Sequence, residues 1–199
     1  MPTLAESAIT GLLIPYLPEI PATLPLQLSI YLDLLLKWNA RTNLTAIRDP
    51  EEIVRRHFGE SLFAARHIAP QTQTLLDFGS GAGFPGLPIA LLRPEIAVTL
   101  AESQNKKATF LREAVRTLNL TTEVWPDRVE AMPPGRRFDA VALRAVDNMQ
   151  AALPAAIARI ARGGQLVLLT SAASAPSEGE TVPLPSSQSS VLYLQTTTR

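Results

Sequence analysis

The feature that most constrains the fold of this chain is a glycine-rich turn that directly follows a short apolar run. Residues 77–83 read D-F-G-S-G-A-G, and the apolar run at residues 74–78 leads into them. Glycine is required where a backbone turns sharply and where a ligand lies against the main chain. A helical pattern at residues 85–92 follows, and then a second apolar run at residues 96–101. This order predicts two strands joined by a ligand-binding turn and a helix.

An acidic residue ends the second predicted strand. Glu102 stands there, where a carboxylate can accept hydrogen bonds from the two hydroxyls of a ribose. The pattern therefore indicates a cofactor that carries a nucleoside. Residues 81–86 also satisfy the G-x-G-x-x-G of dinucleotide-binding proteins, so NAD competes with S-adenosylmethionine. Pro85 and Pro88 remove two N–H donors that a pyrophosphate would need, which favours S-adenosylmethionine.

Strand and helix patterns continue to alternate up to residue 170. This alternation predicts an α/β fold with a mainly parallel, doubly wound, Rossmann-like sheet. We expect one helix to carry Leu153, Ile157 and Ile160 on one face and to stop at residues 162–164, where glycine suits a left-handed exit. The other expected elements are strands at 74–78, 96–101, 123–125, 138–143 and 165–170, and helices at 85–92 and 105–118.

The N-terminal part of the chain carries helical patterns only. Residues 24–38 place leucines at helical spacing, and Asp49, Pro50 and Glu52 have the arrangement of a helix start. We therefore expect residues 1–72 to form a helical extension packed on a main domain that spans residues 73–199.

The C-terminal segment, residues 171–199, is rich in Ser, Ala, Thr and Pro. Its apolar runs are short, and turn-forming residues separate them. We expect a last strand at residues 191–195, paired with residues 181–184.

The composition excludes several kinds of catalytic and metal-binding site. The chain has no cysteine, which excludes a thiol nucleophile, a CxxC redox pair and thiolate metal sites. Its two histidines, His57 and His67, argue against a histidine-rich metal centre, and we expect no metal. His57 lies on the apolar face of its predicted helix, which favours a core histidine over a catalytic base. Prolines interrupt the apolar N-terminal stretch, so we expect a cytoplasmic protein without a membrane span.

Basic residues gather in one predicted helix although the chain as a whole is neutral. The 18 Lys and Arg residues balance 18 Asp and Glu residues, yet Lys106, Lys107 and Arg112 fall within residues 105–118. That helix begins at the carboxyl end of a strand, where open α/β sheets bind their ligands. We expect these three residues to contact RNA phosphates near the cofactor; the alternative is an ordinary solvated helix face.

Several stretches, in one order, resemble the bacterial small-subunit rRNA guanine-N7 methyltransferases, the family also called glucose-inhibited division protein B. The resemblance covers about residues 25–170 and implies a class I S-adenosylmethionine-dependent methyltransferase domain at residues 73–199. The family's usual Lys-Gly after the fifth strand is replaced by Thr170-Ser171. The stretches are Trp38-Asn39 with Asn43-Leu44-Thr45, Arg56-His57-Phe58 with Ser61-Leu62, residues 77–86 with their GSGAGFPG core, Lys106-Lys107 with Phe110-Leu111, and Arg144-Ala145.

The resemblance also implies a set of cofactor-binding residues. Two would contact S-adenosylmethionine in the glycine loop, three would surround its ribose, two would flank its adenine, and one at the end of the fourth strand would complete the pocket. In that order they are Gly79 and Phe84; Glu102, Ser103 and Gln104; Val129 and Glu130; and Arg144.

The expected reaction is methyl transfer to a guanine N7 of 16S rRNA, in free rRNA or in the small ribosomal subunit. Methylation at carbon 5 of a pyrimidine needs a cysteine, which the chain lacks, and residues 144–147 carry no polar-Pro-Pro-aromatic motif of the kind that serves exocyclic amines. A ring N7 has a free lone pair and loses no proton, so no catalytic base is assigned. We expect a monomer. The alternatives are a nicotinamide-dependent oxidoreductase and a non-catalytic RNA- or ribosome-binding module on the same fold.

Overall fold

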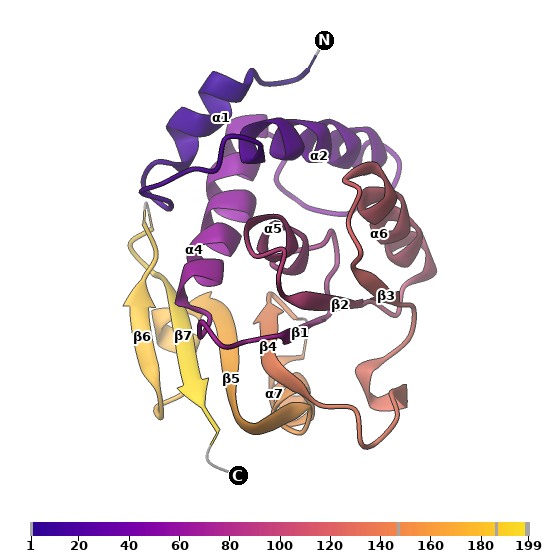
Figure 1. The fold of residues 1–199 in the computed structure, drawn as a ribbon, viewed down its shortest axis with the longest axis vertical. Helices are drawn as coiled ribbons and strands as arrows, with labels where there is room; N and C mark the ends of the chain where they lie inside the picture. Colours follow the sequence, from indigo (N-terminus) through magenta and orange to yellow (C-terminus); the bar gives the residue numbers. More distant parts are fainter. Residues whose placement is uncertain (1, 147, 186, 198–199) are drawn as a thin grey trace.

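The computed structural model describes residues 2–146, 148–185 and 187–197, which build a layered α/β fold around a seven-stranded sheet (Figure 1). The strands are β1 (Thr74–Phe78), β2 (Ala97–Ala101), β3 (Glu123–Trp125), β4 (Phe138–Arg144), β5 (Ile160–Ser171), β6 (Glu180–Pro183) and β7 (Ser190–Thr196). Their spatial order is β3-β2-β1-β4-β5-β7-β6. The strands from β3 to β5 are parallel, whereas β7 is antiparallel to both β5 and β6. The predicted mainly parallel sheet and the predicted C-terminal strand pair are both confirmed.

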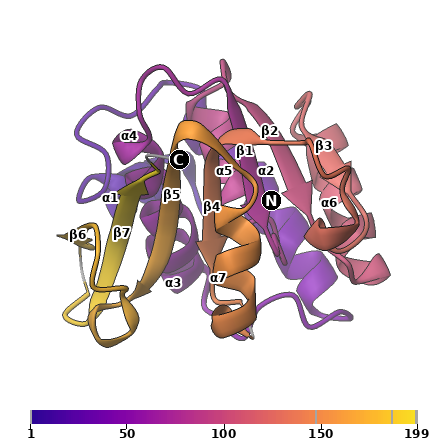
Figure 2. The ribbon, with the colours of Figure 1, turned by 90° about the horizontal axis from the view of Figure 1, so that it is seen from below.

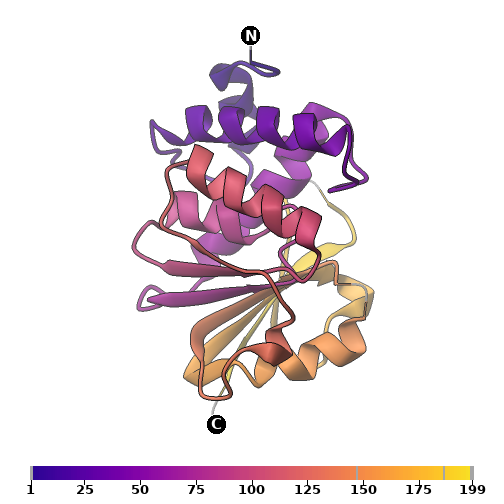
Figure 3. The same ribbon diagram turned by 90° about the vertical axis from the view of Figure 1, so that its right-hand side faces the viewer.

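Helices cover both faces of this sheet, as a doubly wound fold requires. The N-terminal helices and those that follow β1 and β2 lie on one face, and the helix that follows β4 lies on the other (Figure 3). Figure 2 shows β6 and β7 at one edge of the sheet and β3 with its neighbouring helix at the opposite edge. The helices are α1 (Glu6–Leu13), α2 (Leu24–Asn39), α3 (Pro50–Glu52), the π-helix η1 (Ile53–Gly59), α4 (Glu60–His67), α5 (Gly86–Leu92), α6 (Asn105–Thr117), α7 (Met149–Ile157), and the 3₁₀ turns η2 (Val129–Ala131) and η3 (Ala172–Ser174).

Side chains on each strand alternate between two hydrophobic clusters. On β4, Ala140 and Ala142 belong to the cluster beneath α1, α2, α4, α5 and α6, whereas Val141 and Leu143 belong to the cluster beneath α7 and η2. This period of two is the one expected of a strand buried on both faces. The sheet is therefore the shared wall of two hydrophobic cores.

The strand order reverses between β1 and β4. β1 pairs with β2 on one side and with β4 on the other, so the connections that leave their carboxyl ends diverge. Such a reversal leaves a crevice at the carboxyl edge of an α/β sheet, and ligands bind there. The glycine-rich turn after β1 lies at this position.

The N-terminal helices start where their sequence signals predict. Asp49 caps α3 by accepting a hydrogen bond from the N–H of Glu52 (2.8 Å), and Pro50 occupies the first helical position. The chain then runs without a break through η1 into α4. None of the helices within the described ranges is long and apolar enough to cross a membrane.

One predicted helix is wrong at its C-terminal end. α7 stops at Ile157, and Ile160 already belongs to β5, where it pairs with Phe138. The N–H of Phe138 donates to the carbonyl of Arg159 (2.8 Å), so strand pairing takes the backbone group that a longer helix would have used. Gly163 does have a positive φ of +75°, but it lies inside β5 rather than at a helix exit.

Candidate functional site

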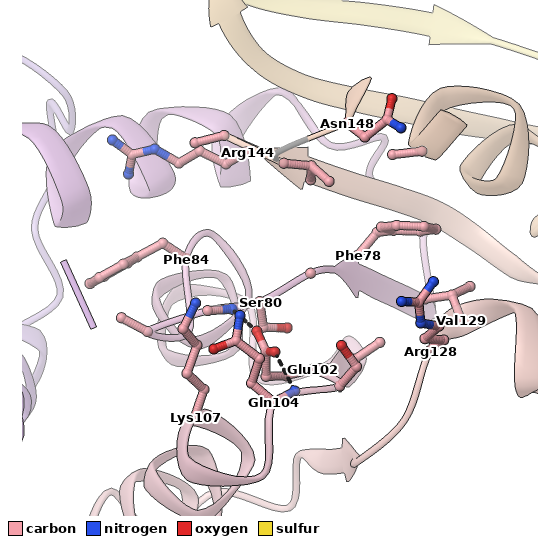
Figure 4. A pocket seen from close by; sticks show the side chains of 18 of the residues that line it. Phe78, Ser80, Phe84, Glu102, Gln104, Lys107, Arg128, Val129, Arg144 and Asn148 are labelled. Carbon is pink, nitrogen blue, oxygen red and sulfur yellow. Dashed lines mark hydrogen bonds between the residues drawn. The ribbon is translucent and has the colours of Figure 1, made fainter. Parts of the chain in front are cut away.

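A cavity of about 570 Å³ opens at the carboxyl edge of the sheet, where the ends of β1, β2 and β4 meet (Figure 4). It is lined by the glycine loop after β1, by the residues that join β2 to α6, by the η2 segment, and by Ala145, Val146 and Asn148 between β4 and α7. A further wall comes from the N-terminal part of the chain, through Leu44 and Thr45 in the segment after α2 and through His57 in η1. Segments that lie far apart in the sequence therefore share one cavity.

The glycine loop, residues 79–83, is tied to the neighbouring strand. The N–H groups of Gly79 and Ser80 both donate to the carbonyl of Ala101 at the end of β2 (3.0 and 2.9 Å). At Gly81, φ is +56°, and the nearest atom to an added Cβ would lie 3.9 Å away. Gly81 thus leaves open space beside the main chain, as a close approach by a ligand requires.

Tyr31, on α2, supports the same loop from the other side. Its hydroxyl donates to the carbonyl of Ala82, and its side chain is fully buried. A Cβ added at Gly83, where φ is +93°, would lie 2.6 Å from the Tyr31 hydroxyl oxygen. Glycine is therefore required at position 83 by conformation and by space. The Tyr31 ring stacks with the rings of Phe58, Phe84 and Phe110.

Glu102 joins the glycine loop to the start of α6. One carboxylate oxygen accepts from the N–H of Gly81 (3.0 Å), and the other accepts from the N–H of Gln104 (2.8 Å). Each oxygen keeps a second lone pair for a ligand hydroxyl. The carboxylate lines the middle of the cavity, between Phe84 on one side and Phe78 with Val129 on the other (Figure 4).

The start of α5 has no donor to offer a pyrophosphate. The N–H of Gly86 donates to the Asp77 carboxylate (2.9 Å), and the N–H of Leu87 donates to a loop carbonyl (2.8 Å). Pro85 and Pro88 have no N–H group. Dinucleotide-binding turns use free N–H groups of this kind for their phosphates, so the arrangement suits a cofactor without phosphate.

Asp77 itself is sealed beneath the loop. Burial raises the pKa of its carboxyl to about 7, and the nearby Glu102 adds to the rise, whereas the hydrogen bond from Gly86 opposes it. One of its oxygens, Oδ1, has no hydrogen-bond partner among the described residues. Asp77 thus fixes the entry of the chain into α5 without reaching the cavity.

The wall formed by η2 is held by one buried arginine. Arg159, only 8% exposed, donates to the carbonyls of Val129 (3.0 Å), Met132 (2.9 Å) and Pro133 (2.6 Å). These bonds fix the backbone that brings Val129 and Glu130 to the cavity. No sequence signal singled out Arg159, because its partners are main-chain atoms.

Arg144 lies at the end of the cavity near Phe84, and its guanidinium is held by the N-terminal helices. It forms an ion pair with Glu60 (2.8 Å) and donates to the carbonyl of Arg56 (2.9 Å). Burial lowers the pKa of Arg144 and raises that of Glu60, while their mutual attraction opposes both shifts. A second guanidinium nitrogen, Nη1, is buried and has no partner within the described part of the chain.

His57 and Thr45 lie beside Arg144 at the same end. The Oγ1 atom of Thr45 is 2.7 Å from Nε2 of His57, and the imidazole stacks on the ring of Phe84 at 4.6 Å between centroids. Burial, together with the charges of Arg144 and Arg56, lowers the pKa of His57 to about 3. The imidazole is therefore neutral at physiological pH.

The eight residues expected at the cofactor all line this one cavity. The three basic residues expected to contact RNA do not all lie at it. Lys107 lines the cavity, whereas Lys106 and Arg112 are exposed on α6 outside its lining. Arg112 lies seven residues beyond the start of α6, which places it roughly 10 Å further along the helix. The eight are Gly79, Phe84, Glu102, Ser103, Gln104, Val129, Glu130 and Arg144.

The wall made by Thr45 and His57 was not predicted from the sequence. The apolar helix face favoured a core position for His57, but the side chain is only partly buried and lines the cavity. The available signal was that both residues lie in the stretches that carry the family resemblance. Across the described residues, no group of three His, Cys, Asp or Glu side chains is arranged to hold a metal ion.

The chain matches a known protein family over most of its length. A family model described as rRNA small subunit methyltransferase G matches residues 26–187. The chain is 42% identical over 140 residues to the ribosomal RNA small subunit methyltransferase G of Xanthomonas euvesicatoria, which covers 70% of this chain and 65% of that protein. It is 47% identical over 120 residues to the protein of the same name from Chromobacterium violaceum, covering 60% of this chain and 57% of that protein. The matched part thus spans less than two thirds of these relatives.

Solved structures share the fold. TYW2 of M. jannaschii in complex with AdoMet superposes with a TM-score of 0.57 at 12% identity, over 70% of this chain and 74% of that chain. A 16S rRNA methyltransferase of T. thermophilus, in complex with AdoMet and guanosine, gives a TM-score of 0.52 at 17% identity, over 90% of this chain and 44% of that chain. The predicted class I methyltransferase fold is confirmed.

Proposed function

The chain belongs to the rRNA small subunit methyltransferase G family, and we propose that it transfers the methyl group of S-adenosylmethionine to a guanine N7 of 16S rRNA. The observation that carries the proposal is the cavity itself. It joins a glycine loop, a carboxylate suited to a ribose and a helix start without free N–H donors. That donor set supports a nucleoside cofactor without phosphate, and it gives no support to a nicotinamide dinucleotide.

Different residues of the cavity would contact different parts of such a cofactor. Glu102, with Ser103 and Gln104, would hold the ribose, and Val129 with Glu130 would flank the adenine. Gly79 and Phe84 would contact the methionine part, and Arg144 would complete the pocket beyond it. When bound, S-adenosylmethionine supplies a methyl group that its sulfonium has already activated.

The chain's own contribution to catalysis would be alignment and exclusion of water. Guanine N7 attacks with a free lone pair, so the reaction needs no proton acceptor. His57 accords with this, because its pKa of about 3 leaves it neutral and its Nε2 is engaged by Thr45. The rigid loop and the neighbouring Tyr31 would hold the methyl donor in line with the acceptor.

RNA would approach over α6. Lys107 lies at the cavity, and Lys106 and Arg112 extend the positive charge along the exposed side of the helix. Lysine and arginine contacts to phosphates orient RNA without reading its sequence. We further propose that residues 1–72 act as an extension of the methyltransferase domain, because they supply one wall of its cavity.

The deciding experiment is methyl transfer from labelled S-adenosylmethionine to 16S rRNA and to small subunits that lack N7-methylguanine. The expected product is N7-methylguanine, located by chemical cleavage at the modified base. Glu102→Ala should weaken S-adenosylmethionine binding by at least roughly tenfold through the lost charge-assisted hydrogen bonds, and the exposed Glu19→Ala should not. Binding of both cofactor and rRNA without any transfer would instead identify a non-catalytic module, and tighter binding of NAD would identify an oxidoreductase.

The RNA-contacting residues can be tested separately. Replacing Lys106 and Arg112, which lie outside the cavity lining, by Gln should leave S-adenosylmethionine affinity unchanged and weaken rRNA binding. Adding Lys107→Gln gives the triple variant, which should weaken rRNA binding further. The slope of log affinity against log salt should fall by roughly 0.7–0.9 for each lost phosphate contact. The exposed Arg162→Gln is the matched control, and an unchanged slope in the triple variant would assign these residues to a solvated helix face.

A further inference from the structure

At the end of the cavity beyond Phe84, the N-terminal part of the chain adds residues to those of the sheet. Leu44 and Thr45 come from the segment after α2, and His57 comes from η1. In Figure 4, Phe84 lies on the opposite side of Glu102 from Val129. If the adenine lies against Val129 and the ribose against Glu102, this end lies past the methionine part, where a methyl acceptor must enter.

A buried side chain holds the backbone of this wall in place through hydrogen bonds. Asn39, 4% exposed, accepts from the N–H groups of Leu44 (2.9 Å) and Thr45 (3.1 Å) and donates to the carbonyl of Thr45 (3.0 Å). Arg48 clamps the same turn by donating to the carbonyl of Asn39 (2.8 Å) and to the Asn43 side chain (2.9 Å). The position of Thr45 is therefore fixed before any ligand arrives.

The polar atoms at this end are not fully used by the protein. The hydroxyl of Thr45 accepts from the N–H of Ile47 (3.2 Å) and lies 2.7 Å from Nε2 of His57. Nδ1 of His57 and Nη1 of Arg144 are buried and lack partners among the described residues, although both side chains line the cavity. Buried polar groups are normally paired, and exceptions are often found at functional sites.

The charges at this end also suit the acceptor. Transfer to N7 leaves a positive charge on the base, so a cationic wall would oppose the reaction. The imidazole of His57 stays neutral, and Glu60 pairs with the guanidinium groups of both the buried Arg144 (2.8 Å) and the exposed Arg56 (3.7 Å). The wall combines the imidazole of His57, which stacks on Phe84, with the hydroxyl of Thr45 and the ion pair between Arg144 and Glu60.

We propose that this end of the cavity is the binding subsite for the acceptor base, a purine turned out of the RNA, and that Thr45 and His57 position it. The proposal rests on the proposed function and assigns a role to residues outside the cofactor site. A base turned out of its stack is held by aromatic surfaces and by hydrogen bonds to its edge. Thr45 and His57 touch the base rather than the sulfonium, so their loss should affect the acceptor and spare the cofactor.

The test separates these two affinities. Thr45→Val keeps the shape and removes the hydroxyl, and His57→Gln removes the imidazole; Thr10→Val, on α1 and away from the cavity, is the matched control. We expect S-adenosylmethionine dissociation constants within about twofold of wild type and kcat/KM for rRNA lowered about tenfold or more. Wild-type kcat/KM in both variants would overturn the proposal, and so would a loss of cofactor affinity equal to the loss of kcat/KM. If His57→Gln does not fold, Thr45→Val alone decides.

A second measurement keeps this proposal distinct from the proposed function. Binding of guanosine monophosphate to protein saturated with S-adenosylhomocysteine is measured by calorimetry, with no methyl transfer involved. Weaker binding to Thr45→Val than to wild type supports the subsite, even if the wild-type protein transfers no methyl group to rRNA. Equal binding to both overturns the subsite and leaves the proposed function intact.

Discussion

One face of the sheet lies beneath α1, α2, α4, α5 and α6, whereas the other lies beneath α7 and the short η2 (Figure 3). We refer to these as the thick face and the thin face. The thick face holds a continuous core in which Tyr31 reaches the glycine loop. The thin face holds its part of the cavity through Arg159, which bonds the backbone around η2.

The two halves of the cavity are kept in place by different interactions. On the thick face, interlocking apolar side chains determine the position of the loop, so an error in shape is costly. On the thin face, the short η2 segment buries Val129 and Met132, and directional bonds from a buried guanidinium fix its backbone. Loss of those bonds should let the segment open locally at low free energy. We therefore expect the free energy of unfolding to respond most to added atoms on the thick face and to lost hydrogen bonds on the thin face.

The largest expected effect is steric and lies on the thick face. In Gly83→Ala, the new Cβ would lie 2.4 Å from Cδ1 of Leu87 and 2.6 Å from the Tyr31 hydroxyl, at a φ of +93°. Overpacking and backbone strain together should lower the free energy of unfolding by roughly 3–4 kcal/mol, measured by denaturant titration. Gly81→Ala is the control, because its new Cβ would have no atom of the chain closer than 3.9 Å. It should keep most of the stability and lose cofactor affinity; equal destabilisation of both variants would remove the steric distinction.

The next largest effect concerns the thin face. Arg159→Met keeps an apolar stem and leaves the carbonyls of Val129, Met132 and Pro133 without a donor. We expect a loss of about 2–3 kcal/mol in unfolding free energy, with faster hydrogen exchange confined to residues around η2. Arg162→Met, at an exposed site three residues further on, should change neither quantity. Wild-type exchange around η2 in Arg159→Met would show that apolar contacts alone hold the thin face.

A smaller effect depends on pH and reports whether His57, on the thick face, is neutral in the folded protein. The pKa of His57 falls from 6.5 to about 3 on folding, so the unfolded chain binds an extra proton between these values. Stability therefore falls as pH drops below 6.5, and between pH 7.5 and pH 5 His57 should contribute a loss of about 2 kcal/mol. Asp77, with a raised pKa of about 7, acts in the opposite direction over much of this range. The difference between wild type and His57→Gln isolates the histidine, and a pH-independent difference would mean that His57 titrates normally in the folded protein.

The smallest effect compares one buried tyrosine from each face. Tyr31→Phe removes the hydroxyl that donates to Ala82 and should cost about 1 kcal/mol, with cofactor affinity weakened about threefold to tenfold. Tyr193, on β7 in the thin-face core, is equally buried, but its hydroxyl has no partner within the described ranges. Tyr193→Phe should be neutral or slightly stabilising. The same loss from both substitutions would indicate that the bond to Ala82 has no special part in holding the loop.

The sheet was largely predictable because its signals are local. β1 was predicted at its observed limits, since its apolar run ends in glycine and its side chains are buried on both faces. Ile160 was misplaced because apolar spacing of three and four residues cannot show where strand pairing begins. Only the contact with Phe138, more than 20 residues earlier in the sequence, ends α7 where it does.

The residues proposed to bind the cofactor were named from sequence motifs and the family resemblance, whereas those of the proposed acceptor subsite were not. His57 lies in η1, a π-helix whose wider turn departs from the period of 3.6 residues on which a helical face is predicted, and its side chain meets Thr45. Their contact also depends on Asn39, which acts through main-chain atoms and leaves no pattern in the sequence. Arg159 escaped prediction for the same reason.

The double hydrogen bond of Glu102 has a kinetic consequence. Because its two oxygens already hold the N–H groups of Gly81 and Gln104, the loop and the start of α6 need not order when a ligand arrives. Association should then be a single bimolecular step whose rate rises linearly with cofactor concentration, without the plateau that a slow loop closure imposes. The heat capacity change of binding should likewise reflect the buried ligand surface alone, with no contribution from local folding.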